Sequence, residues 1–239
     1  MLIPKYAQEW SMMDTTAGTR RRAVAAGAAV VMVVAGLSVT AQPALGVLAK
    51  LNDDAYVELG YPGGAPSGPT ATNYGSDAVL RVQGPYAKPE QRSFIKFDLS
   101  AVPTNDPGQV RSATLTLFAH EVTGPGVLSV STVADGGAAW TEGAVSGQSA
   151  PELAATAPGC TSYPLTKVIN AADKGTFITF DVTCLVQGWI QAPSSNQGIA
   201  LRYRTKNLVV AFDSKEATDT SHPPTLEITL GSVAPAGKN

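Results

Sequence analysis

Residues that commonly carry catalysis are scarce in this sequence. Its 239 residues include two histidines, two cysteines and three tryptophans, and 17 Lys and Arg nearly balance 19 Asp and Glu. The near-neutral charge excludes the strongly basic surface of a phosphate-backbone binder, so no nucleic-acid partner is expected. His120 and His222 lie at the ends of expected strands, and neither a His-Glu-x-x-His nor a Gly-x-Ser-x-Gly pattern occurs. These absences argue against zinc peptidases and serine hydrolases.

Long apolar runs are also scarce, and the one present lies near the N-terminus. Residues 23–39 follow three consecutive arginines at 20–22 and precede small residues and a proline. This order is typical of a secretory signal. We therefore expect an N-terminal extension and signal over 1–49, extracellular localisation and no membrane attachment after cleavage. An uncleaved anchor is the alternative, because the run reaches the lower length limit of a spanning helix. The cleavage position stays open among Ala41, Gly46 and Ala49.

The two cysteines, Cys160 and Cys184, both lie in the part of the chain that export would expose to an oxidising environment. An even pair in that setting predicts a disulfide bond. The closed loop of about 25 residues would contribute on the order of 3 kcal/mol to stability. Two free buried thiols are the alternative, and with no histidine nearby the pair does not form a zinc site.

After residue 50, apolar residues follow a period of two rather than a helical period. Ala113 and Leu117 belong to one such run, and Ile228 and Leu230 to another, so we expect these four side chains to share an interior. The pattern predicts one all-β domain over 50–230, a two-sheet jelly-roll-type β-sandwich, with one helical turn at 184–190 and a flexible tail at 231–239. The expected strands are 53–58, 78–83, 93–99, 112–117, 128–131, 176–182, 198–204, 208–213 and 225–230.

Several stretches together resemble a known family. They are DAYV at 54–57, NYGSDAVLRV at 73–82, RSFIKFDLSAVP at 92–103, VRSATLTLF at 110–118, AWTE at 139–142, FDVTCLVQGWI at 180–190, NQGIALR at 196–202, FDSKEA at 212–217 and PPTLEITL at 223–230. In this order they resemble the DNRLRE domain, also grouped as carbohydrate-binding module family 96. The resemblance implies a secreted β-sandwich, with polysaccharide binding in some members. After AWTE, relatives usually have a second tryptophan-containing stretch that this chain lacks, which puts a ligand role of 136–151 in doubt.

Aromatic side chains are the first candidates for sugar contact, because sugar C–H groups pack on their faces. Four tyrosines lie in or beside Gly/Pro-rich loops, where a ring can be exposed, and are expected as platforms: Tyr61, Tyr74, Tyr86 and Tyr163. Trp140 is a further candidate, but for Trp140 and Trp189 alike a place in the core is the other interpretation. Tyr203 belongs to the core-facing register of its strand.

Four cations are expected on the outward register of three strands: Arg81, Lys96, Arg202 and Arg204. If those strands adjoin, the cations form a basic face that could hold the carboxylates or sulfates of an acidic glycan. The alternative is a solvated outer face with ordinary cross-strand charge pairs.

Acidic residues suggest two further hypotheses. Asp53, Asp54 and Glu216 offer oxygen ligands for a structural calcium ion, the only cofactor expected, although solvated strand ends would explain them equally well. Glycosidase chemistry would need two facing carboxyls, for which Glu142, Asp135 and Glu58 are available on paper.

Together, these observations predict a secreted, non-catalytic polysaccharide-binding module, with an acidic cell-wall or matrix glycan as its expected ligand. A structural or adhesive extracellular protein without a sugar site is the alternative, and a glycan hydrolase or lyase is the lesser alternative.

Overall fold

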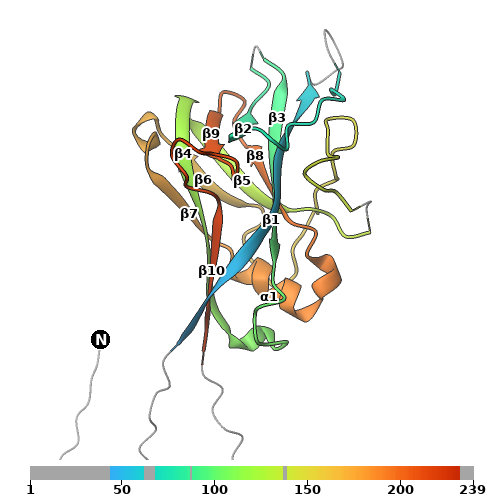
Figure 1. The fold of residues 1–239 in the computed structure, drawn as a ribbon, viewed down its shortest axis with the longest axis vertical. Coiled ribbons are helices and arrows are strands. Elements are labelled where there is room, and N and C mark those ends of the chain that lie inside the picture. Colours follow the sequence, from blue (N-terminus) through green and yellow to red (C-terminus); the bar gives the residue numbers. More distant parts are fainter. Residues whose placement is uncertain (1–43, 62–67, 87, 137–138, 232–239) are drawn as a thin grey trace, which may run out of the picture. The chain divides into compact units, whose positions relative to one another are not determined.

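The computed structural model describes residues 44–61, 68–86, 88–136 and 139–231, and the predicted signal at 20–39 lies outside them. Within these residues the structure has ten strands and one α-helix, which confirms the all-β prediction (Figure 1). The elements are β1 (Leu45–Gly60), β2 (Val79–Gln83), β3 (Glu90–Asp98), β4 (Val110–Gly124), β5 (Gly126–Thr132), β6 (Leu165–Ile169), β7 (Phe177–Asp181), α1 (Thr183–Gln191), β8 (Ile199–Tyr203), β9 (Val209–Asp213) and β10 (Thr225–Leu230).

Six strands close into a hydrogen-bonded ring. Antiparallel pairing runs in the order β1, β10, β4, β9, β2 and β3, and β3 pairs with β1 again. Strands β8, β5 and β6 continue outward from β3, and β7 pairs with β4. The expected jelly-roll sandwich is not confirmed, because β1 and β4 are long enough to pair with β10 at one end and with β3 or β9 at the other.

The interior is built from the predicted apolar registers. Ala113, Leu117, Ile228 and Leu230 belong to one buried cluster, which confirms that they share an interior. Ile228 lies directly opposite Ala113 in the pairing of β10 with β4. Helix α1 adds four buried residues from one side to the same cluster: Leu185, Val186, Trp189 and Ile190.

A second, smaller core lies on the outer side of β1, β3 and β8. There Ala55, Val57 and Phe94 are covered by Trp140 and Val145 from the connection that follows β5. Because this connection packs on the sheet, it buries a face that the alternating pattern predicts to be exposed.

Three details differ from or complete the expectations. Strand β6 was not predicted, since it is short and Ile169 is its only fully buried residue. The Cys160–Cys184 disulfide is formed and joins the preceding connection to α1, as predicted. Strand β1 begins at Leu45, within the range assigned to the leader. No helix among the described residues has the length and apolar character needed to cross a bilayer.

Candidate functional site

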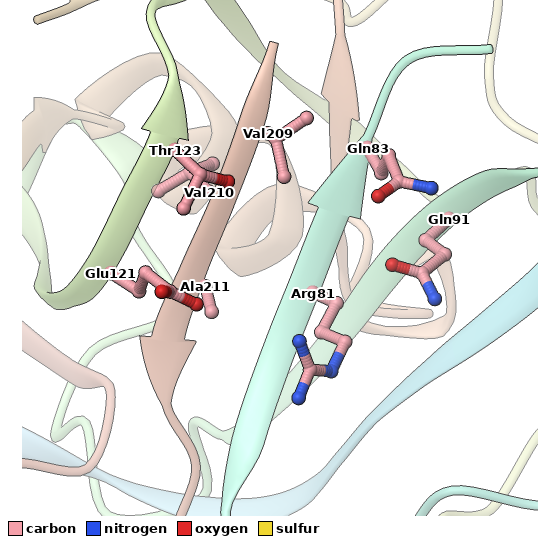
Figure 2. A pocket seen from close by; sticks show the side chains of 8 residues that line it. All are labelled: Arg81, Gln83, Gln91, Glu121, Thr123, Val209, Val210 and Ala211. Atoms are coloured by element: carbon pink, nitrogen blue, oxygen red, sulfur yellow. The ribbon is translucent and has the colours of Figure 1, made fainter. Parts of the chain in front are cut away.

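A row of polar side chains runs from β1 and β3 onto the outer surface of β2, β9 and β4, and we call it the polar strip. It arises because outward residues alternate with buried ones: Arg81 stands between Leu80 and Val82, which both lie in the main core. The strip comprises Glu58, Arg81, Gln83, Gln91, Glu121 and Thr123, all but Glu58 visible in Figure 2.

Strand β9 forms the floor of the strip. Ala211 pairs with Arg81 on one side and with Glu121 on the other, so the two charged residues flank a small side chain (Figure 2). Adjacent strands lie about 4.8 Å apart, which places the backbones of β2 and β4 roughly 10 Å from each other. The result is a shallow depression with a volume of about 20 Å³.

One end of the strip is held rigidly by hydrogen bonds. Gln91 Nε2 donates to Glu58 Oε1 at 2.8 Å, and the Tyr74 hydroxyl donates to Glu58 Oε2 at 3.0 Å. Gln83 Nε2 donates to the carbonyl of Pro89 at 2.7 Å. These bonds fix the rotamers of the glutamate and both glutamines, so this end presents a preorganised polar surface.

The other end of the strip carries groups without polar partners. In the described part of the chain, the side chains of Arg81, Glu121 and Thr123 make no hydrogen bond or ion pair. The Arg81 guanidinium lies 5.9 Å from the centre of the Tyr56 ring. A planar five-donor cation and a carboxylate across a one-strand gap can together bind several hydroxyls of a sugar.

Two stacked tyrosines, Tyr56 of β1 and Tyr74 of the connection before β2, lie beside the strip. The rings of Tyr56 and Tyr74 lie 4.3 Å apart with an angle of 16° between their planes. Burial, followed by hydrogen bonding to Asp77, raises the pKa of Tyr56 far above its usual range. Tyr56 therefore remains a neutral hydroxyl donor to Asp77, a supporting contact rather than a reactive group.

The tyrosines expected as platforms lie in different places. Tyr74 is half-buried beside the strip, through its bond to Glu58. Tyr86 is 74% exposed and follows β2, just beyond Gln83. Tyr61 is half-buried at the end of β1. Tyr163 is engaged in the interior, since its hydroxyl accepts from the amide of Thr132 and donates to the carbonyl of Ala154.

The structure places Trp140 in the smaller core and not on the surface, where a platform would lie. Its side chain packs on Phe94, with 5.7 Å between the ring centres, and its Nε1 donates to the carbonyl of Gln197 at 2.8 Å. Lys96 is held in the same place, because Nζ donates to the carbonyl of Trp140 at 2.9 Å and lies 4.8 Å from the indole centre. Trp189 is also buried, as its structural alternative predicted.

The four predicted cations do not share one face. Gln91 lines the strip together with Arg81. Lys96 lies five residues after Gln91 on β3, so its side chain points to the opposite side of the sheet. Leu201 pairs with Ser93, so Arg202 faces the same side as Lys96. Arg202 and Arg204 are exposed, and Arg202 Nε lies 3.9 Å from Glu90 Oε1.

The acidic candidates are divided in a similar way. Asp54 and Glu216 lie close together, and Glu142 rather than Asp53 joins them. Asp53 supports the group indirectly by accepting from the amide of Glu142 at 3.2 Å. Glu58 lies in the strip, so the structure assigns the proposed glycosidase acids Glu58 and Glu142 to different hydrogen-bonding groups.

The strip contains four residues that the sequence reading did not single out: Gln83, Gln91, Glu121 and Thr123. Glu121 and Thr123 flank the buried Val122 in β4, and this outward alternation was a usable signal. The assembly of the strip from four strands was not visible, because it depends on which strands pair.

A search of curated proteins finds no significant match. The model of carbohydrate-binding module family 96 matches residues 48–230, from β1 to the end of β10. This match covers most of the chain and confirms the resemblance seen in its motifs. The chain therefore belongs to carbohydrate-binding module family 96, a family of non-catalytic binding modules.

Proposed function

We propose that this protein is a secreted, non-catalytic module that binds a polysaccharide chain along the polar strip. The observation that carries the proposal is the unpaired placement of Arg81 and Glu121 on either side of Ala211. Unpaired polar groups on a rigid sheet favour a ligand that brings its own donors and acceptors, as a sugar does. The shallow floor suits an extended chain lying across the strands, with exposed Tyr86 available beyond Gln83 for packing against a sugar ring.

Within this proposal, the ligand is an acidic glycan of a cell wall or matrix. Arg81 can bind a sugar carboxylate through two parallel hydrogen bonds, since it makes no ion pair within the described residues. Glu121 would then accept from neighbouring hydroxyls. Arg202 and Arg204 are exposed on another side of the sheet and lie outside this site.

The test is retention on matched acidic and neutral polysaccharides, with Arg81→Ala as the variant and Arg204→Ala as its control. Both substitutions remove one arginine, but only the first removes a group of the strip. We expect Arg81→Ala to weaken retention about tenfold or more, corresponding to one lost charge-assisted contact pair. The loss should be larger on the acidic polymer.

The outcomes separate the alternatives. Equal losses from both variants would contradict binding at the strip. No retention on any polymer would favour the structural or adhesive alternative, and release of reducing ends by the purified protein would favour a hydrolase. A lyase would instead generate unsaturated sugar ends.

Secretion is part of the proposal and is supported by the order of basic, apolar and small residues at 20–46. Cleavage after Ala41 would leave β1 intact, whereas cleavage after Ala49 would remove Val47 and Ala49 from the interior. N-terminal sequencing of the secreted protein would identify the site.

A further inference from the structure

Three carboxylates from distant parts of the chain meet beside β1. Asp54 lies in β1, Glu142 in the segment that covers the smaller core, and Glu216 in the turn after β9. One ligand oxygen of each lies within 4.8 Å of the others. We call these three side chains the carboxylate cluster. Like charges so close together repel each other strongly unless a proton or a cation lies between them.

Two oxygens of the cluster are buried without a partner. Asp54 is 1% exposed, and its Oδ1 accepts no hydrogen bond, while its Oδ2 accepts from the amide of Lys215 at 2.9 Å. Glu216 Oε2 is likewise buried and unpartnered. A buried carboxylate oxygen without a donor is costly, so these atoms indicate a missing positive group.

Lys215 is the single cation that forms ion pairs with the cluster in the described part of the chain. Its Nζ contacts Glu142 Oε2, donates to the carbonyl of Asn52 at 2.9 Å, and lies 3.9 Å from Glu216 Oε1. One ammonium thus faces three carboxylates and does not reach Asp54 Oδ1. Its side chain is 28% exposed and flexible, so it can move into solvent when a stronger cation binds.

We propose that the carboxylate cluster is a calcium site, formed by Asp54, Glu142 and Glu216, from which a bound calcium ion displaces the Lys215 ammonium. The donor set consists of carboxylates, with the carbonyl of Asn52 beside it, and Ca²⁺ prefers such oxygen ligands. No histidine or cysteine belongs to the group, which disfavours zinc. This proposal is independent of the polysaccharide proposal.

The ion would join three segments that the sequence separates widely. It would tie the covering segment, through Glu142, and the turn after β9, through Glu216, to Asp54 in β1. The side chains of Asp54, Tyr56 and Glu58 point to the same side of β1. A bound ion would therefore also restrain the part of β1 that carries Glu58 of the polar strip.

The test measures calcium binding to the purified protein by titration calorimetry and by thermal unfolding in CaCl₂ or EDTA. We expect saturable binding with a Kd of about 0.1–1 mM, as in extracellular modules. The unfolding midpoint should rise by roughly 5 °C at saturating calcium. Asp54→Asn and Glu216→Gln should each weaken binding about tenfold or more, and Glu152→Gln, an exposed acid outside the cluster, should not.

Two variants distinguish a calcium site from a merely structural carboxylate group. Asp54→Asn removes a buried charge, so its unfolding midpoint in EDTA should equal or exceed that of the parent while its calcium response is lost. Lys215→Met should increase the affinity for calcium, because the competing ammonium is gone. The proposal is overturned if the parent protein shows no calcium binding, if Asp54→Asn responds like the parent, or if Mg²⁺ binds as tightly as Ca²⁺.

Discussion

The outer surface of β2, β9 and β4 and the outer surface of β3 and β8 arise from the same alternation of side chains. On the first, Arg81 and Glu121 face outward and form the open polar strip. On the second, Phe94 and Lys96 face outward too, but Trp140 covers them. An outward register therefore shows only that a side chain points away from the main core. Whether solvent or another segment meets it depends on the rest of the chain.

Two glycines allow close backbone contacts of the covering segment, Gly147 with β1 and Gly75 with Glu142 of that segment. A Cβ at Gly147 would lie 1.9 Å from the carbonyl oxygen of Glu58, and one at Gly75 would lie 2.2 Å from the carbonyl oxygen of Glu142. The backbones touch at these points, so no larger residue fits without displacement.

Among substitutions on the covered face, Trp140→Ala is expected to reduce stability most. It removes a buried indole from the smaller core together with its bond to Gln197, and should reduce the free energy of unfolding by about 3–5 kcal/mol. Denaturant titration measures the loss. Tyr86→Ala, at an exposed aromatic, should change stability by less than about 0.5 kcal/mol. If Trp140→Ala instead kept the stability of the parent but lost polysaccharide retention, the covered face would be the binding surface.

Gly147→Ala should have an intermediate effect. The new methyl group forces the covering segment away from Glu58, and overpacking of this kind costs about 1–3 kcal/mol. Gly143→Ala is a matched control in the same segment, since its Cβ would meet nothing within 4 Å. Equal stability of the two variants in denaturant titration would show that the segment does not rest closely on β1.

Lys96→Met should have the smallest effect of the three. It keeps the apolar stem but removes the bond to the Trp140 carbonyl and the contact with the ring, at a cost of about 1 kcal/mol. Polysaccharide retention should not change, in contrast to Arg81→Ala. If Lys96→Met kept full stability but lost polysaccharide retention, Lys96 would belong to the binding surface.

The sequence predicted more of the fold than of the site. Period-two runs located nine strands because alternation is a local property, and the helical turn and disulfide were found for similarly local reasons. Strand β6 escaped because its pattern is short and half-polar. The closed ring escaped because it depends on β1 and β4 each pairing with β10 at one end and with another strand at the other end, β3 for β1 and β9 for β4.

Prediction of the sites was limited by strand pairing. Arg81 was identified, yet its neighbours Gln83, Gln91 and Glu121 were not, since they come from three strands whose order the sequence does not reveal. Asp54 and Glu216 were identified as possible ligands, whereas Glu142 was considered only for catalysis. Its place beside Asp54 results from the covering segment.

The amino-acid sequence by itself determined the all-β class, the family, the interior registers and the disulfide, because each depends on residues close in sequence or on motif order. Tertiary structure alone decided which outward side chains meet solvent, which cations share a surface and which carboxylates meet. Those outcomes depend on contacts between segments far apart in the chain, and the free energy of such contacts comes from shape and burial that no local pattern encodes.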